Sequence, residues 1–159
     1  MSRKVTKSLQ RKTNPDRKYQ SVLVQRLINK SMLDGKKQAA ERAVYAALEG
    51  AAKKLNSEDP VAVFEKALAN ISPDFEVKSR RVGGANYQIP FPISGHRQQH
   101  FAFSWLVQAA RARQGMPYAK RLELEIIDAY NETGTAFKKK EDCHRMAEAN
   151  RAFAHFARA

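Results

Sequence analysis

The sequence is poor in several residue types, and each scarcity narrows what the protein can be. Cys143 is the only cysteine among 159 residues, which excludes an internal disulfide and fits a reducing compartment such as the cytoplasm. No stretch approaches the roughly 20 consecutive apolar residues of a membrane-spanning helix, and the basic first residues lack the apolar segment of a secretory signal. We therefore expect a soluble cytoplasmic protein without a membrane partner.

Acidic residues are also scarce relative to basic ones. The chain has 16 Asp and Glu against 29 Lys and Arg, which leaves a formal charge of +13. Such an excess indicates a polyanionic partner. Nucleic acid is the commonest partner of this kind, because each phosphate that is neutralised releases condensed counterions. An acidic membrane surface is the alternative, and the lack of long apolar runs weakens it.

The positive charge is densest in residues 1–18, where seven cations stand against Asp16 as the only acidic residue. The low apolar content of this segment predicts a disordered basic arm that becomes ordered on a polyanion, ahead of a helical domain at residues 19–159. A solvated tail is the alternative. The candidate nucleic-acid contacts of the arm are Arg3, Lys4, Lys7, Arg11 and Lys12.

Apolar residues recur with the helical period through most of the remaining chain and predict a mainly α fold, a single domain of about six helices. Asp34 and Gly35 form a turn signal after the first helix, and Asp59 followed by Pro60 is a cap for the third. The helices are expected from Ser21 to that turn, over about 39–51, from Pro60 to Ser72, over about 102–115, from Pro117 to Gly134, and from about Glu141 with Met146, Ala149, Asn150 and Phe153 along one side.

Between about residues 75 and 91 the pattern of apolar residues changes to a period of two, which predicts one β-hairpin. Gly83 and Gly84 supply the positive φ angles of a tight turn. Pro90 and Pro92 cannot donate to a ladder, so we expect the second strand to be short or to form an edge. Because a two-stranded ribbon is marginal alone, it either leans on the helices or projects as an arm. Tyr87 either packs inward, which we favour, or stacks on a base.

Residue groups that could support catalysis or bind a metal are incomplete. His96 and His100 have a spacing that zinc sites use on helices, but no third ligand accompanies them. Cys143 and His144 are neighbours that would point about 100° apart on a helix, so a thiol and base pair is disfavoured and packing of the thiol is preferred. We expect no enzyme, no metal and no cofactor.

The basic clusters of the domain fall mainly at the ends of predicted elements, where side chains can reach phosphates while the helix faces stay packed. A solvated surface is the alternative for each cluster. A DNA-binding regulator is disfavoured, because it would place its polar residues along a recognition helix. The candidate contacts are Lys36 and Lys37, Lys78, Arg80 and Arg81, Arg111 and Arg113, and Lys138, Lys139 and Lys140, which precede the last predicted helix.

Three stretches carry a resemblance to a known family. They are residues 33–37, reading Leu-Asp-Gly-Lys-Lys, residues 75–88 around the double glycine, and residues 134–155, which contain the Lys run and end in Ala-Phe-Ala-His. Together they closely resemble the bacterial-type small-subunit ribosomal protein seven family. Residues 93–104 depart from the family by carrying fewer basic residues, which leaves Arg97 as the expected RNA contact there.

The resemblance implies a structural role in the small ribosomal subunit. It implies a primary binder of the three-prime major domain of small-subunit ribosomal RNA that nucleates assembly of the head. It also implies that the hairpin lies near the exit-site transfer RNA and the messenger path, and that other proteins of the head and platform are neighbours. The tip facing this region would comprise Val82, Gly83, Gly84, Ala85 and Asn86. Asp142 is expected to cap the last helix.

Overall fold

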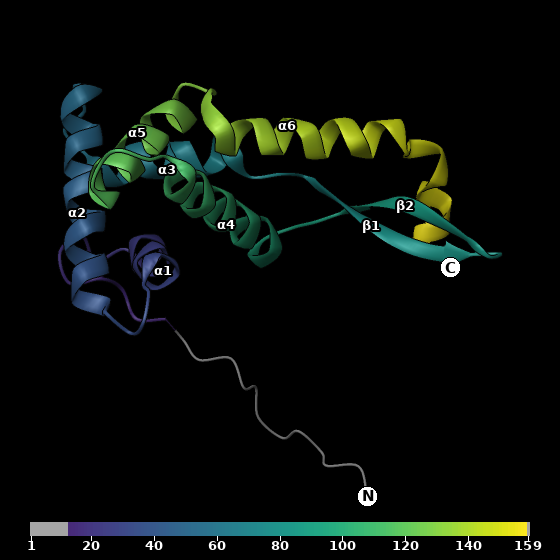
Figure 1. The fold of residues 1–159 in the computed structure, drawn as a ribbon, viewed down its shortest axis with the longest axis horizontal. Helices are drawn as coiled ribbons and strands as arrows, with labels where there is room; N and C mark the ends of the chain where they lie inside the picture. The colour runs from purple at the N-terminus through teal and green to yellow at the C-terminus, as the bar shows by residue number, and fades with distance from the viewer. Residues whose placement is uncertain (1–12, 159) are drawn as a thin grey trace, which may run out of the picture.

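Five helices pack around one core, while a sixth helix and a hairpin extend away from it side by side (Figure 1). The computed structural model describes residues 13–158. The elements in chain order are α1 (Val22–Ser31), α2 (Lys37–Lys54), α3 (Pro60–Ile71), β1 (Phe75–Val82), β2 (Ala85–Pro92), α4 (His96–Ala112), α5 (Tyr118–Tyr130), α6 (Gly134–Ala149) and the 3-10 helix η1 (Arg151–Arg158). The predicted mainly α fold with one hairpin is thus confirmed.

The core is built from the apolar stripes of the first five helices. Leu27, Leu48, Phe64, Leu106 and Ile126 come one from each of these helices and are fully buried. Full burial of one such side chain stabilises the fold by about 1.5 to 3 kcal/mol. α2 contributes four buried alanines and packs against α5.

Local signals set several helix ends as predicted. Asp59 Oδ1 accepts a hydrogen bond from the backbone N–H of Val61 at 2.8 Å, and Pro60 opens α3. Asp34 and Gly35 both have positive φ, at 52° and 72°, in the turn between α1 and α2. These ends depend on residues close in sequence, so a sequence pattern can locate them.

The hairpin has the predicted turn. Gly83 and Gly84 have φ angles of 59° and 90° and connect Val82 to its partner Ala85, as a two-residue turn with positive φ at both central positions requires. β2 has eight residues, as many as β1, so of the two expected alternatives the edge strand is found and the short strand is not. Both strands are edges of a two-stranded sheet, and an edge strand tolerates Pro90 and Pro92.

The boundary between α5 and α6 differs from the prediction. α5 already ends at Tyr130, and Gly134 is the first residue of α6 instead of the stop of α5. The reason is a tertiary contact, because Oε1 of the buried Glu125 accepts the backbone N–H of Ala136 at 2.9 Å and satisfies a donor in the first turn of α6. Lys138, Lys139 and Lys140 therefore lie within this helix and do not precede it.

The last part of the chain also departs from the prediction. Asp142 lies inside α6, where it pairs with Arg145, so it does not cap the helix. The expected apolar side is not buried as a stripe, since Met146 is 51% exposed and α6 ends before Phe153. α6 extends beyond the core (Figure 1), and within it only Ala136 and Ala147 are buried. Phe153 instead lies in η1, against the hairpin.

Candidate nucleic-acid interface

A groove with a volume of about 610 Å³ separates α1 from the first turns of α4. Arg26 and Lys30 line it from α1, and His96 and His100 line it from α4. Arg26 donates a hydrogen bond to the side-chain oxygen of Gln99, which joins the two helices. We call this surface the α1–α4 groove. Arg26 and Lys30 were not among the predicted contacts, although their spacing of four on a predicted helix places them on one face.

The hairpin base carries a second pair of cations, held by a buried carboxylate. Glu76 is only 5% exposed, and its Oε2 accepts a hydrogen bond from Nε of Arg97 at 2.8 Å, while its Oε1 pairs with Lys78. Burial alone would raise the pKa of Glu76, but the hydrogen bonds from Lys78 and Arg97 outweigh it and lower the pKa. Arg97 and Lys78 both keep about half of their side chains exposed, so the interaction orients two cations without hiding them.

The outer hairpin is held by the C-terminal 3-10 helix. The ring of Tyr87 lies 5.0 Å from that of Phe153 and 5.7 Å from that of Phe156. Nη1 of Arg80 donates to the backbone oxygen of Phe156 at 3.0 Å. The packing interpretation of Tyr87 is therefore confirmed, although its partners come from η1 and not from the helical core.

The end of the hairpin is open to solvent. Arg81 and the tip residues Gly83, Gly84, Ala85 and Asn86 are exposed. Figure 1 shows this tip far from the five-helix core.

A smaller pocket of about 300 Å³ brings together two cations that the sequence placed at separate helix ends. Lys36, before α2, and Arg111, near the end of α4, line it together with Arg121 and Tyr118 of α5. Its floor includes Ala39 and Ala43 of α2. We call it the α2–α5 pocket. Lys37 is exposed at the first position of α2, next to this pocket in sequence but not part of its lining.

Arg113 is partly buried and paired with acidic side chains. Its guanidinium bonds Glu125, which is fully buried, and also pairs with Asp128. Burial would lower the pKa of Arg113, but the hydrogen bonds that it donates to Glu125 and Asp128 outweigh this effect and raise it. That Arg113 contacts nucleic acid stays a prediction, and the structure gives its charge a role in the fold.

The other predicted cations are dispersed. Lys139 donates to Gln108 of α4 at 3.0 Å, and Lys140 donates to the backbone oxygen of Asn70 in α3 at 2.8 Å, whereas Lys138 is exposed. The contacts predicted for the arm lie outside the described residues. They are Arg3, Lys4, Lys7, Arg11 and Lys12.

Residues 13–158 contain no group of three or more His, Cys, Asp or Glu side chains that could hold a metal ion. His144 Nε2 accepts the backbone N–H of Asp74 at 3.0 Å, while the Cys143 thiol contacts the backbone oxygen of Phe75. The two side chains thus have separate partners. Burial raises the pKa of the Cys143 thiol, which disfavours the reactive thiolate. No helix in the described part of the chain is long and apolar enough to cross a membrane.

The architecture and surface define a helical protein with a basic hairpin arm, and comparison with known proteins identifies its family. The family described as ribosomal protein S7p/S5e matches the chain over residues 2–151, so the chain belongs to this family. It is accordingly a structural protein and not an enzyme.

Relatives named small ribosomal subunit protein uS7 are similar along most of their length. The relative from Chloroflexus aggregans is 57% identical over 144 residues, which cover 91% of each chain. The relative from Dictyoglomus turgidum is 54% identical, with 92% of this chain and 93% of the relative covered. The relative from Thermotoga petrophila is 53% identical, with 92% and 94% covered.

Proposed function

We propose that this protein is a structural component of the small ribosomal subunit in the cytoplasm, where it binds the three-prime major domain of the ribosomal RNA and nucleates assembly of the head. Family membership and relatives named small ribosomal subunit protein uS7 support the ribosomal role. The observation that carries the RNA-binding part is the pair of half-exposed cations at the hairpin base, Arg97 and Lys78, which the buried Glu76 holds in place.

The shape of this surface suits RNA. Cations on helix ends and on a ribbon can follow a folded phosphate backbone, and RNA recognition depends largely on such shape and phosphate contacts. In this proposal Lys78, Arg80, Arg81 and Arg97 bind ribosomal RNA from the hairpin and the start of α4. The contact surface is extended, so the affinity should fall steeply with salt concentration.

The hairpin tip has a second role in the proposal. Gly83 and Gly84 carry no side chain, so a nucleic-acid backbone can approach the turn closely. The tip, from Val82 to Asn86, would lie near the exit-site transfer RNA and the messenger path, and other proteins of the head and platform would be neighbours. The distance of the tip from the core supports this part, because it gives the hairpin reach beyond the RNA bound at its base (Figure 1).

A filter-binding comparison tests the proposal. The full chain is titrated against the head fragment of small-subunit ribosomal RNA and against random duplex DNA at matched salt. We expect clear preference for the RNA fragment. Equal affinity for the two would contradict the proposal, because it would reduce the basic surface to a non-specific polyanion binder.

A further inference from the structure

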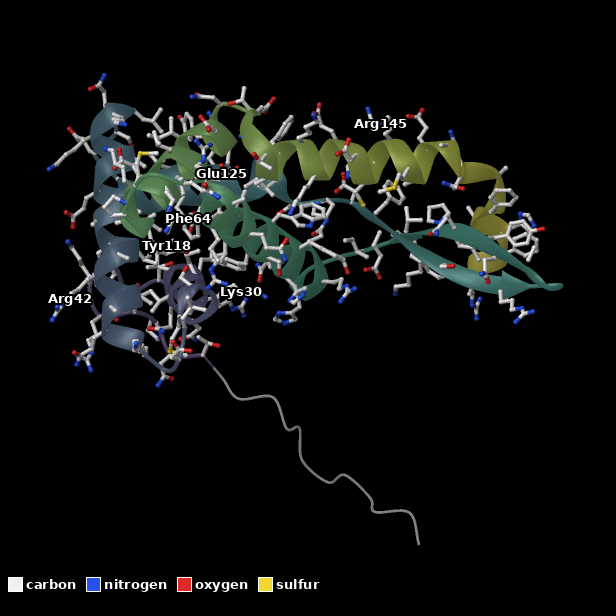
Figure 2. All side chains as sticks on the ribbon, in the orientation of Figure 1. Lys30, Arg42, Phe64, Tyr118, Glu125 and Arg145 are labelled. Atoms are coloured by element: carbon white, nitrogen blue, oxygen red, sulfur yellow. The ribbon has the colours of Figure 1, made fainter. Side chains whose placement is uncertain are left out.

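The α2–α5 pocket has an apolar floor and an aromatic wall. Ala39 and Ala43 contribute methyl groups to the floor from successive turns of α2. The wall is the ring of Tyr118, whose hydroxyl donates to Oγ of Ser31 at 2.8 Å and is therefore already satisfied. Figure 2 shows Tyr118 where α5 approaches α1 and α2. The ring offers a flat surface. Burial raises the pKa of Tyr118, so the hydroxyl stays uncharged at neutral pH.

Three cations complete the lining beside Ser31, Leu33 and Ala40. Lys36 and Arg111 are exposed residues that line the pocket, and Arg121 lines it from α5. The N-terminus of α2 adds partial positive charge, because its N-cap Lys36 offers no side-chain acceptor to the first turn. A ligand that fits this lining must combine an apolar flat part with a negative charge.

Arg121 also has an unused hydrogen-bond donor. Its Nη1 donates to the backbone oxygens of Arg113 and Arg111, at 2.8 and 3.3 Å. Its Nε is buried and has no hydrogen-bond partner within residues 13–158. Buried donors without an acceptor are rare in folded proteins and call for an explanation. An acceptor atom on a bound ligand would provide one.

We propose that the α2–α5 pocket binds a single unpaired nucleotide of the ribosomal RNA. The base packs between the alanine floor and Tyr118, and its phosphate contacts Lys36 and Arg111. The inference rests on the proposed function, since it deepens the RNA contact of the helical domain. The volume is at the lower end of the roughly 300 to 1,000 Å³ range of small-ligand sites, so one base fits and a duplex does not. Sequence-specific RNA recognition commonly uses such extruded bases.

The test fills the pocket without changing charge. Ala39 is exposed on α2, so Ala39→Met keeps a good helix former while its side chain occupies the pocket. Ala46→Met, at an exposed position of the same helix that does not line the pocket, is the matched control. Each protein is titrated with the ribosomal RNA head fragment at several salt concentrations, and the complexes are probed with base-specific modifying reagents.

We expect Ala39→Met to weaken RNA binding by about tenfold, as loss of one stacked base predicts, with an unchanged salt slope. One unpaired base that the unsubstituted protein protects should become reactive again. Ala46→Met should behave like the unsubstituted chain. Lys36→Met is the second variant, and it should lower the salt slope by about one phosphate contact.

Wild-type affinity and protection in Ala39→Met would overturn the inference. Weakened RNA binding without renewed chemical reactivity of any base would also overturn it, because the pocket would then face a protein side chain or the RNA backbone. The proposed function fails in a different way, when the unsubstituted chain shows no preference for the head fragment over random duplex DNA.

Discussion

Arg113 donates two hydrogen bonds to the same oxygen of Glu125, from Nε at 2.8 Å and from Nη2 at 2.7 Å. The other oxygen of this carboxylate accepts the backbone N–H of Ala136. One buried group therefore joins the end of α4, the body of α5 and the first turn of α6, at the position where Figure 2 labels Glu125. This contact links the first turn of α6 to α5.

We predict that Arg113→Ala lowers the free energy of unfolding by about 3 kcal/mol, because it leaves the Glu125 carboxylate buried without its charge partner. Urea denaturation at neutral pH measures the change. Arg42→Ala is the control, since Arg42 is exposed on α2, and such surface changes usually cost less than about 0.5 kcal/mol. A similar small effect in both variants would show that the ion pair does not stabilise the fold.

Asp16 gives a prediction about acid stability. Its buried carboxylate accepts backbone N–H groups of Lys18, Tyr19 and Ser21, and the hydroxyl of Tyr45. Burial would raise the pKa of Asp16, but these hydrogen bonds lower it. A carboxyl with a lowered folded-state pKa stabilises the fold above its ordinary pKa of about 3.9, and this contribution is lost as the pH falls through the folded-state value.

Asp16→Asn should therefore be less stable than the unsubstituted chain at pH 7, by about 2 kcal/mol, since hydrogen bonds to a charged acceptor are lost. The difference should shrink as the pH falls below about 4. Urea denaturation at pH 7 and at pH 3 checks both parts. A difference that stays constant with pH would mean that the charge of Asp16 does not contribute.

The contact of η1 with the hairpin predicts a local effect. Phe153→Ala removes a ring that packs on Tyr87, and aromatic pairs contribute about 0.5 to 1.5 kcal/mol beyond their buried area. Amide hydrogen exchange in β1 and β2 should accelerate several-fold, while exchange in α2 and α5 should not change. Met146→Ala, at an exposed position of α6, is the control. Equal acceleration in the core would indicate global destabilisation instead.

The basic residues before Thr13 are predicted to contact phosphates. Deletion of residues 2–12 removes Arg3, Lys4, Lys7, Arg11 and Lys12 but retains Asp16 and its hydrogen bonds. We expect the slope of log affinity against log salt to become shallower, because several phosphate contacts are lost with their counterion release. Filter binding to the ribosomal RNA head fragment measures the slope. An unchanged slope would contradict a role for these cations.

Substitution of Arg80 and Arg81 by Ala should weaken binding to the same RNA fragment. Both residues are exposed on β1, so the helical core should keep its stability. Far-UV circular dichroism during thermal unfolding checks the fold. If the doubly substituted protein loses its helical structure, the two residues are structural and the RNA prediction for them is wrong.

The sequence by itself determined the features that depend on neighbouring residues. The helical period fixed the class of fold, Asp59 and Pro60 fixed the start of α3, and Gly83 and Gly84 fixed the hairpin turn. Capping and positive φ act within a few residues, so each is visible in a short stretch of sequence. The net charge of +13 likewise indicated a polyanionic partner without any coordinates.

Only the tertiary structure decided which of these residues meet. The first turn of α6 meets Glu125 of another helix, and the buried Glu76 of β1 meets Arg97 of α4. The meeting of Lys36 and Arg111 in one pocket depends on how α2, α4 and α5 pack. Burial, ion pairing and the shape of a pocket arise between segments far apart in the chain, and the period of one segment carries no information about the distance to another.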